Sequence, residues 1–255
     1  PENVMVVGAH TNRAGTHAAF VSQAPDRPVE AFTSALPKFA ALQASHVQDA
    51  PPALGRTEVM SWKAADGKDV EGLVTYPAGY KEGTRVPLLV VVHGGPAGVF
   101  TGGFTGTLTP YPVAGFAARG YAVLRVNPRG SSGYGFDFRN ANFQDWGGGD
   151  YRDIMSGVDA LIARGVADEE RMGIMGWSYG GYMTMWMQGH TTRFKCIASM
   201  MGVYDLEAEY GATEELWFPE HDFRGRPWDS ADYQTWSPSN FVKEFKTPAL
   251  VITGE

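Results

Sequence analysis

The hydrophobic pattern from residue 56 onward opens with a β-hairpin and continues with buried strands. Residues 58–63 and 70–76 are rich in strand-forming residues and flank the turn sequence Ala-Asp-Gly-Lys at 65–68. The runs at 86–92 and 121–126 are continuously apolar, which indicates strands covered on both faces rather than strands with one face in water. The pattern therefore predicts a sheet in the interior of a domain.

Apolar residues at helical spacing alternate with these strands. Residues 112–119 predict a short helix, and residues 150–164 place four apolar side chains on one helical face (Ile154, Val158, Leu161 and Ile162). Gly165 is expected to end the second helix, and further strands are expected at 196–201 and 249–253. A hairpin followed by alternating strands and helices predicts a doubly wound, mostly parallel α/β sheet with helices on both faces, the arrangement of the α/β-hydrolase fold.

The first 50 residues have a different pattern, with short β-prone runs at 3–8 and 18–22 separated by a turn at 11–15. Two or three strands cannot bury enough surface to be stable alone, so we expect them to be the last blade of a larger β assembly. Residues 37–52 would then be a linker. This predicts two parts, 1–50 and 51–255; the alternative is an N-terminal extension packed on the main domain.

Composition and charge narrow the possible functions. The chain has 255 residues, 44% hydrophobic and 19% charged, which is usual for a globular protein with a sizeable core. A formal net charge of −7 without a basic stripe argues against nucleic acid as a partner. The sequence contains no run of 18 apolar residues, so it predicts no membrane-spanning helix. Because the chain starts at Pro1 without a signal-peptide pattern, we expect a piece of a longer protein, whose compartment (cytoplasmic or periplasmic) is undetermined.

The single cysteine, Cys196, excludes a disulfide within the chain. It lies in the apolar run 196–201, and we expect it to be a buried packing residue. The redox compartment therefore stays undetermined.

The chemistry of the chain centres on a nucleophile-elbow sequence at residues 176–180, Gly-Trp-Ser-Tyr-Gly. An apolar run at 172–175 predicts a buried strand before it, and residues 182–187 suit a helix after it. A strand that meets a helix at Ser178 needs a turn so sharp that flanking side chains would collide, and glycine removes those side chains. The pattern predicts a catalytic serine; the alternative is a glycine-rich turn whose serine only caps the helix.

A serine nucleophile needs donors for the oxyanion of its tetrahedral intermediate. The backbone N–H of Tyr179, directly after the serine, is one expected donor. The second is expected from the loop His93-Gly94-Gly95-Pro96, which follows the first long buried strand. The alternative for this sequence is an ordinary tight loop. His93 is expected to be structural, because in this fold the histidine base follows the serine in the chain.

The histidine base and its carboxylate are not found where the fold requires them. After Ser178 only His190 and His221 remain, one at the end of the helix that follows the serine and one in a polar loop. In this fold the acid follows the strand that here ends at Thr253, and the histidine follows one more strand. The chain stops at Glu255, so we expect a domain truncated before its last strand, with the acid and base outside this chain.

Three motifs together resemble the catalytic domain of the prolyl oligopeptidase family of serine peptidases, in particular its acylaminoacyl-peptidase and dipeptidyl-peptidase branches. They are the His-Gly-Gly-Pro loop at 93–96, Asn-Pro-Arg-Gly-Ser-Ser-Gly-Tyr-Gly at 127–135, and the elbow extended to Tyr182. The resemblance covers residues 56 to 255. It implies Ser178 as nucleophile, the amides of Tyr179 and Gly95 as oxyanion donors, and an N-terminal β-propeller of which residues 1–50 are the end.

The same resemblance implies a short peptide as substrate and a partner segment that carries the missing Asp and His, present as another chain or as the continuation of this one. Cleavage would proceed through an acyl-enzyme. No metal or organic cofactor is implied, because no Cys or His cluster has ligand spacing and Gly94-Gly95 is not a phosphate loop. Two other interpretations stay open, a carboxylesterase with the same elbow and an inactive piece that serves structure or binding.

Several residues are candidates for substrate binding. Arg125 is a candidate for a peptide carbonyl or carboxylate, whereas Arg129, in a Pro-Arg-Gly turn, is expected to brace loops. Tyr210 and Trp217 follow the strand after the elbow, where such enzymes form the pocket for the residue before the cleaved bond; packing is the alternative role. Four acidic residues nearby are interpreted as a solvated face rather than a site for a free N-terminus (Glu207, Glu209, Glu214 and Glu215).

Overall fold

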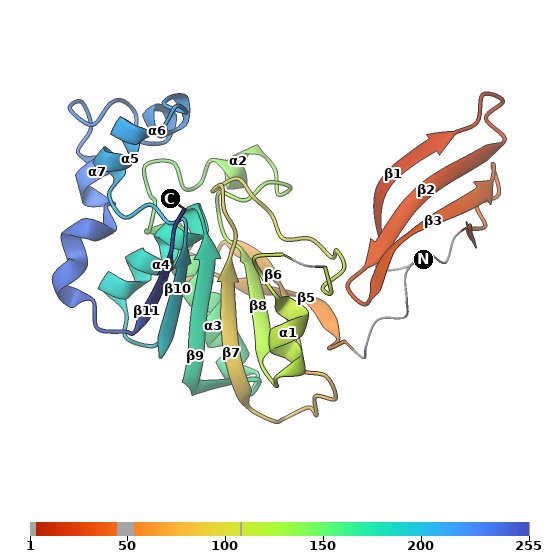
Figure 1. Ribbon diagram of the computed structural model, residues 1–255, viewed down its shortest axis with the longest axis horizontal. Helices are drawn as coiled ribbons and strands as arrows, with labels where there is room; N and C mark the ends of the chain where they lie inside the picture. Colours follow the sequence, from red (N-terminus) through yellow and green to blue (C-terminus); the bar gives the residue numbers. More distant parts are fainter. Residues whose placement is uncertain (1–3, 45–53, 108, 255) are drawn as a thin grey trace. The chain divides into compact units, whose positions relative to one another are not determined.

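The computed structural model describes residues 4–44, 54–107 and 109–254 and contains two sheets (Figure 1). The larger sheet has seven strands in the order β11-β10-β9-β7-β8-β6-β5. The pairs β7–β8, β7–β9, β9–β10 and β10–β11 are all parallel. Its strands are β5 (Thr57–Lys63), β6 (Asp69–Thr75), β7 (Val86–Val92), β8 (Ala122–Asn127), β9 (Ala167–Trp177), β10 (Cys196–Met200) and β11 (Ala249–Ile252).

This sheet confirms the predicted α/β class and the expected hairpin, since β5 and β6 are joined by a turn closed by the bond from Gly67 N–H to Ala64 O. Strand β7 has the predicted bounds, and its last five residues are at most 7% exposed. It lies between two parallel neighbours, and crossover helices cover both faces of a parallel sheet, which accounts for its uninterrupted apolar sequence.

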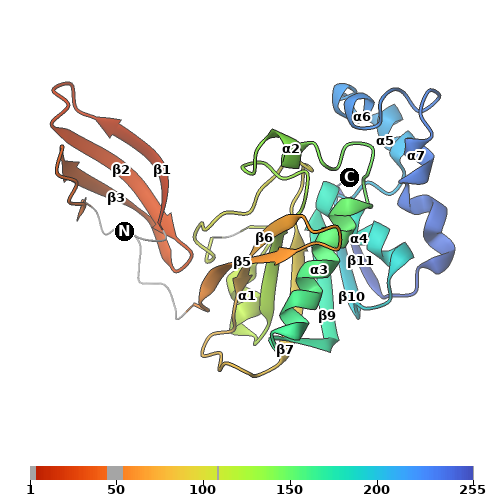
Figure 2. The ribbon, with the colours of Figure 1, turned by 180° about the vertical axis from the view of Figure 1, so that it is seen from behind.

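Two long helices pack on this sheet, α3 (Gly149–Ala163) and α4 (Tyr179–His190), and both contact β9. Figure 2 shows α3 in front of the strands. The buried face of α3 includes Ile154 and Val158, as their spacing predicted. The helix ends at Ala163, and Gly165, two residues later, has φ +73°. The shorter helices are α1 (Val113–Ala118), α2 (Phe136–Arg139), α5 (Leu206–Ala212), α6 (Trp217–Asp222), α7 (Asp232–Thr235) and the 3₁₀ helix η1 (Pro238–Glu244).

The strand order creates a crevice at one end of the sheet. From β7 the chain crosses to β8 on one side, and it later returns to β9 on the other side. Val92, the last residue of β7, pairs with Gly176, the last but one of β9, so the loops that follow these two strands leave the sheet side by side. Open α/β sheets bind ligands at such a switch point, beyond the carboxyl ends of the strands.

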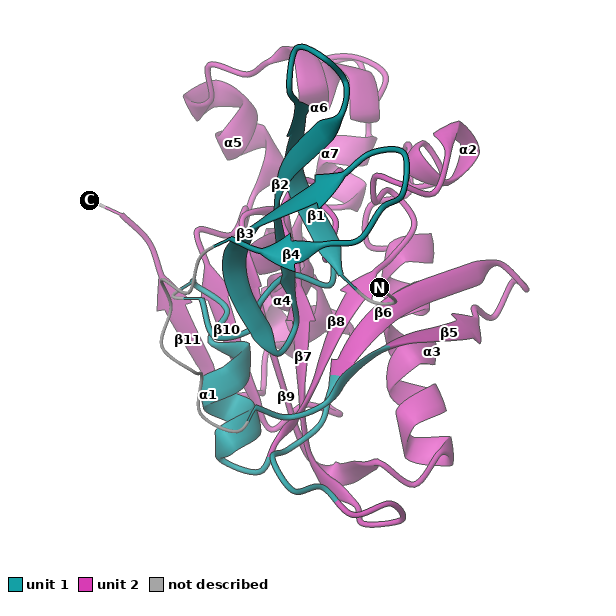
Figure 3. Ribbon diagram, turned by 90° about the vertical axis from the view of Figure 1, so that its right-hand side faces the viewer, with its two compact units in different colours: residues 1–58, 75–80, 101–120 teal, residues 59–74, 81–100, 121–255 magenta. Residues whose placement is uncertain are grey.

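The chain divides into two compact units, residues 1–58, 75–80 and 101–120 in the first and residues 59–74, 81–100 and 121–255 in the second (Figure 3). The first unit contains a four-stranded antiparallel sheet in the order β1-β2-β3-β4. Its strands are β1 (Met5–Thr11), β2 (His17–Ala24), β3 (Arg27–Ala35) and β4 (Leu42–Gln43). Four antiparallel strands are the size of one propeller blade, consistent with the predicted propeller remnant.

One expectation for this part of the chain was wrong in detail. Strand β4 lies within the segment expected to be a linker. Residues 45–52 of that linker, and with them the expected boundary between residues 50 and 51, lie outside the described residues.

Two further differences concern the larger sheet. Strand β9 is longer than the apolar run at 172–175, because Ala167 already pairs with Val86 before a register shift. Cys196 is exposed rather than buried. It is the first residue of β10, and the buried part of this strand begins one residue later, at Ile197. Within the described residues, no helix combines the length and the apolar character that crossing a bilayer requires.

Candidate active site

Ser178 connects β9 to α4 with a backbone that non-glycine residues rarely adopt, φ +58° and ψ −119°. Such a conformation costs about 1–3 kcal/mol and persists where the surroundings enforce it. Here the Ser178 N–H donates to Met200 O at 2.9 Å, and Ser178 O accepts from the Tyr182 N–H at 2.9 Å. The side chain is half-buried, and among the described residues its hydroxyl has no hydrogen-bond partner. The turn therefore presents a free hydroxyl at the end of β9.

The glycines of the elbow are required by close backbone contacts. A Cβ atom at Gly176 would lie 2.3 Å from the backbone of Gly180, and one at Gly180 would lie 2.1 Å from Val92 O. A Cβ at Gly181 would lie 2.6 Å from the Cα of Gly202. The first turn of α4 is therefore pressed against both neighbouring strands, which agrees with the steric argument made from the sequence.

The His-Gly-Gly-Pro loop lies beside the serine. A Cβ atom at Gly94 would be 3.3 Å from the Cβ of Ser178 and 3.9 Å from its Oγ. Gly95 has φ +130°, and in the described part of the chain its N–H donates to no other group. The first N–H groups of α4, including that of Tyr179, have no partner within the helix. The loop and the helix end thus place both expected oxyanion donors near Ser178.

His93 is placed as the sequence analysis expected, as part of the loop structure. Its ring is 4% exposed, with Nδ1 2.8 Å from Gly94 O and Nε2 2.9 Å from Ser131 Oγ. Burial lowers the pKa of His93 below its usual value. With both ring nitrogens occupied, His93 is not available to Ser178.

A pocket of about 530 Å³ opens beside Ser178 in the second unit. Its apolar and aromatic walls come from the loop after β7, from the segment between α2 and α3, and from the segments between β10 and β11 (Pro96, Ala97, Trp146, Val203, Trp217 and Phe218). Trp217 lies at its edge and is 71% exposed. Tyr210 does not line it: its hydroxyl donates to Glu220 Oε1 at 2.6 Å and its ring packs against Trp228 and Tyr233.

The pocket also contains charged residues. Its lining includes one basic residue, Arg139, and two acidic residues, Glu209 and Glu215. His221 and Asp222 line it together, with His221 Nδ1 2.9 Å from Asp222 Oδ1. Of the four acidic residues interpreted as a solvated face, two therefore face this pocket, a placement that local sequence could not reveal because it depends on the path of the chain after β10.

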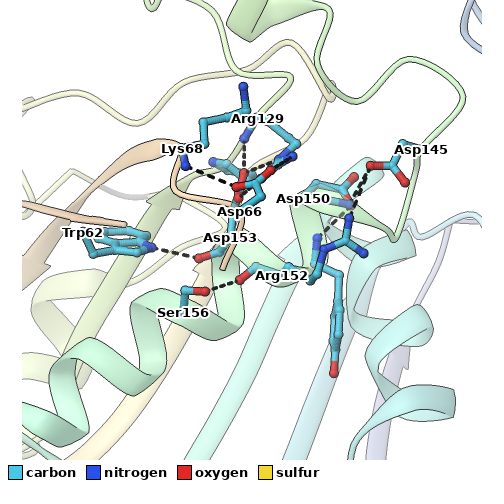
Figure 4. Close-up of polar contacts among 12 residues, drawn as sticks. Trp62, Asp66, Lys68, Arg129, Asp145, Asp150, Arg152, Asp153 and Ser156 are labelled. Atoms are coloured by element: carbon cyan, nitrogen blue, oxygen red, sulfur yellow. Dashed lines mark hydrogen bonds and ion pairs between the residues drawn. The ribbon is translucent and has the colours of Figure 1, made fainter. Parts of the chain in front are cut away.

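The two candidate arginines have different surroundings. Arg129 is a brace: it donates to Asp153 through its backbone N–H, Nε and Nη2, and to Asp66 through Nη1 at 2.8 Å (Figure 4). These carboxylates raise its pKa, and the Arg129 hydrogen bond lowers the pKa of Asp66 to about 2. Arg125, expected to bind substrate, does not line the pocket. It is 7% exposed on β8, where desolvation lowers its pKa to about 10.

The remaining histidines after the serine differ in availability. His190 Nδ1 donates to Trp186 O at 2.8 Å, and its ring stacks on the Trp186 ring at 3.9 Å between centroids. His221 shares the pocket with Ser178 and its side chain is 61% exposed. In the part of the chain that the structure describes, no group of three or more His, Cys, Asp or Glu residues is arranged to hold a metal ion.

Two carboxylates that were not predicted from the sequence, Asp150 and Asp153, are fully buried on α3. Asp150 accepts a short hydrogen bond from the hydroxyl of Tyr179. A signal was present, since Asp150 stands four residues before Ile154 and eight before Val158, and so begins the apolar stripe of the helix. A charged residue on the apolar, buried face of a helix needs a buried partner.

The chain matches the prolyl oligopeptidase family over residues 109–255, a stretch that includes the elbow. It is 38% identical over 190 residues to dipeptidyl-peptidase 5 of Schizosaccharomyces pombe, covering 73% of this chain and 27% of that protein. Acylaminoacyl peptidase of Pyrococcus horikoshii superimposes with a TM-score of 0.84 at 28% identity, covering 98% of this chain and 40% of that one. The structure of an acylaminoacyl peptidase in complex with Z-Gly-Gly-Phe-chloromethyl ketone gives the same values.

The chain thus spans well under half of the length of these relatives. The region that matches the family includes β8 to β11, the elbow and the pocket-lining residues from Arg139 onward. Because the family match extends over more than half of the sequence, the chain belongs to the prolyl oligopeptidase family.

Proposed function

We propose that the complete protein is a serine peptidase that hydrolyses short peptides, with Ser178 as its nucleophile. The observation that carries this proposal is the strained backbone of Ser178, which holds a free hydroxyl beside the Gly94-Gly95 loop and the first turn of α4. Family membership supports peptide hydrolysis over other acyl transfers. The relatives named dipeptidyl-peptidase 5 and acylaminoacyl peptidase support a short peptide as substrate.

The reaction follows from this geometry. Ser178 Oγ attacks the peptide carbonyl carbon while a base takes its proton, and the carbonyl oxygen becomes an oxyanion. The N–H groups of Tyr179 and Gly95 donate to that oxygen. Collapse of the intermediate breaks the C–N bond, and the protonated base returns the proton to the leaving amine. Water then attacks the acyl-enzyme ester by the same route and regenerates Ser178.

We place the base and its carboxylate outside residues 1–255. His93 and His190 are held by other groups, and His221 is on a loop between β10 and β11 rather than after a later strand. The greater length of the relatives supports a segment that supplies both groups. The chain alone is then expected to have negligible activity, because a serine nucleophile without its base loses several orders of magnitude in rate.

The pocket beside Ser178 is proposed to receive the side chain that precedes the cleaved bond. Its aromatic walls, including Trp146 and Phe218, suit an apolar or aromatic side chain. Trp217 is the proposed substrate contact at the rim. Arg125 and Tyr210 are withdrawn as candidate substrate contacts, because neither lines the pocket. In the first unit, the four-stranded sheet is proposed to be the last blade of a β-propeller, and residues 51–255 to be part of the catalytic domain.

The test compares the complete protein with its Ser178→Ala and His221→Ala variants on chromogenic short peptides and p-nitrophenyl esters. We expect the wild type to cleave peptides, and Ser178→Ala to lower kcat by at least about a thousandfold. The variant His221→Ala should stay within about fivefold of the wild type. Ser156→Ala is the matched control, since its hydroxyl bonds only within α3, to Arg152 O.

Each other outcome has a defined meaning. Ester turnover without peptide cleavage indicates a carboxylesterase. The absence of any turnover by the complete protein indicates an inactive family member with a structural or binding role. A thousandfold loss in His221→Ala would contradict the proposed location of the base and assign that role to His221.

A further inference from the structure

The residue after the nucleophile has a side chain that is as tightly held as its backbone. Tyr179 is 2% exposed, and its ring meets the Trp146 ring edge-on at 4.9 Å between centroids. The ring of Tyr182 also lies near it, at 5.6 Å between centroids. The Tyr179 hydroxyl donates to Asp150 Oδ2. Since the proposed oxyanion donor is the N–H of this same residue, the surroundings of the ring bear on the position of the amide.

Asp150 is an unusual partner for a tyrosine, because it is a fully buried carboxylate. Its other oxygen accepts from the Tyr151 N–H at 2.7 Å. Among the described residues no lysine, arginine or histidine pairs with it, and burial raises its pKa to about 7. Burying an unpaired carboxylate is costly, and its hydrogen bonds offset that cost only in part. Within the described parts of the chain, the bond to Tyr179 is the only hydrogen bond of Asp150 that reaches another element.

The helix that carries Asp150 is itself fixed. One turn further along α3, Asp153 accepts three hydrogen bonds from Arg129, which also reaches Asp66 on the β5–β6 hairpin (Figure 4). In addition, Trp62 Nε1 donates to Asp153 O at 3.0 Å. A carboxylate on such an anchored helix can hold the start of α4 in place, where the positive φ of Ser178 leaves the backbone under strain.

We propose that Asp150 is a positioning residue for catalysis: its bond to the Tyr179 hydroxyl holds the backbone N–H of Tyr179 in line for the oxyanion formed by Ser178. This rests on the proposed function. A misplacement of about 1 Å at a reacting group can cost about a hundredfold in rate, whereas substrate binding in the pocket depends on other residues. The bond should therefore affect kcat more than KM.

The test measures kcat and KM of the complete enzyme on a chromogenic peptide for Tyr179→Phe, Asp150→Ala and Asp150→Asn. The first two remove the bond, and we expect kcat to fall about 10- to 100-fold with KM within about twofold. Asparagine keeps an acceptor oxygen and should stay within about threefold of the wild type. The double variant Tyr179→Phe with Asp150→Ala should be no slower than either single variant, because both remove the same bond.

A matched control is Tyr233→Phe. Tyr233 is also fully buried in the second unit, and its hydroxyl donates to Gly225 O at 3.0 Å; neither residue lines the pocket beside Ser178. We expect it to lower thermal stability by an amount similar to that of Tyr179→Phe while leaving kcat near the wild-type value. Equal losses of kcat in both variants would show that packing alone matters and would overturn the proposal.

Three results separate this proposal from the proposed function. If the wild type cleaves peptides and Tyr179→Phe keeps its kcat, the positioning role is wrong and the peptidase assignment stands. If the wild type is inert, the peptidase assignment fails and the positioning role fails with it. If Tyr179→Phe does not fold, the comparison of Asp150→Ala with Asp150→Asn decides, and equal kcat values for these two overturn the proposal.

Discussion

At the scale of single residues, Ser178 shows how a strained conformation is built from neighbours that lack side chains. Its positive φ is possible because Gly176, Gly180 and Gly181 let three backbone segments approach within distances that no Cβ permits. The sequence predicted this turn from the spacing of its glycines together with the apolar strand before it and the helix after it. It could not predict which carboxylate holds the ring of Tyr179, since that contact joins residues 29 positions apart.

Adding one methyl group to the elbow should disable it. In Gly180→Ala the new Cβ would lie 2.1 Å from Val92 O, so the start of α4 has to move. We expect a loss of about 1–3 kcal/mol in the free energy of unfolding and at least about a hundredfold lower kcat, measured by urea denaturation and peptide turnover.

The control is Gly211→Ala in α5, where an added Cβ meets nothing within 4 Å. That variant should keep its activity and gain up to about 1 kcal/mol, because alanine favours a helix over glycine. Equal effects of the two substitutions would contradict the close contact at the elbow.

The buried carboxylate of Asp150 should make stability depend on pH. Its pKa is about 7 in the folded protein against an ordinary value of 3.8. Between about pH 4 and pH 7 the folded state therefore keeps a proton that the unfolded state has released. The contribution of Asp150 to the free energy of unfolding is therefore complete below the pKa of the unfolded state and is lost as the pH rises through the pKa of the folded state. The free energy of unfolding falls over this range by at most about 1.4 kcal/mol per pH unit.

The substitution Asp150→Asn removes this titration. The variant should show a flatter dependence of the free energy of unfolding on pH between 5 and 7 than the wild type, measured by urea denaturation at several pH values. Asp145, Asp153, Tyr179 and Tyr182 surround Asp150 and are present in both proteins, so the difference between the two curves isolates Asp150. Parallel curves would contradict a buried, shifted Asp150.

At the scale of elements, α3 connects parts of the second unit that are distant in sequence. Its Asp153 binds Arg129 in the loop after β8, and the same arginine binds Asp66 in the turn of the β5–β6 hairpin. The helix itself could be predicted from the spacing of Ile154, Val158 and Leu161. The sequence predicted that Arg129 braces loops but not which acidic residues it binds, because a sequence pattern does not reveal which acid a buried arginine will meet.

Removing one side of this buried ion pair should cost much more than removing an exposed one. In Asp153→Ala the 6%-exposed Arg129 side chain loses its main partner, and we expect a loss of about 3–5 kcal/mol in the free energy of unfolding. The matched control is Asp159→Ala on the same helix, which removes an exposed pair with Arg193 and should cost at most about 1 kcal/mol. Similar losses in chemical denaturation would contradict the bracing role.

At the scale of the whole molecule, the fold class and the strands of the larger sheet could be predicted because parallel strands leave long apolar runs. The substrate pocket could not, because its residues come from separate segments that only the folded chain brings together. Trp217, a candidate because it follows β10, lines the pocket, whereas Tyr210, seven residues earlier, donates its hydroxyl to Glu220. The two residues belong to different helices, α6 and α5, so the path of the chain between these helices decides which side chain lines the pocket.

The larger sheet ends in β11, whose residues are all exposed, with Leu250 at 59% and Val251 at 60%. An apolar strand at the end of a sheet is a site for pairing with another strand. We expect a polypeptide of residues 1–255 to self-associate, and Val251→Lys to reduce this, as measured by light scattering. Val242→Lys, at an exposed valine outside the strand, is the control and should change little. A monomeric, soluble 1–255 polypeptide would contradict this expectation.

The most direct test of the central claim is to treat the complete protein with an organophosphonate that reacts only with activated serines, and to locate the adduct by mass spectrometry of peptides. The free hydroxyl of Ser178 and the N–H groups beside it predict a single adduct on Ser178, formed much more slowly in the Tyr179→Phe variant. An unlabelled Ser178 in the complete, folded protein would contradict the assignment of this elbow as the centre of a peptidase.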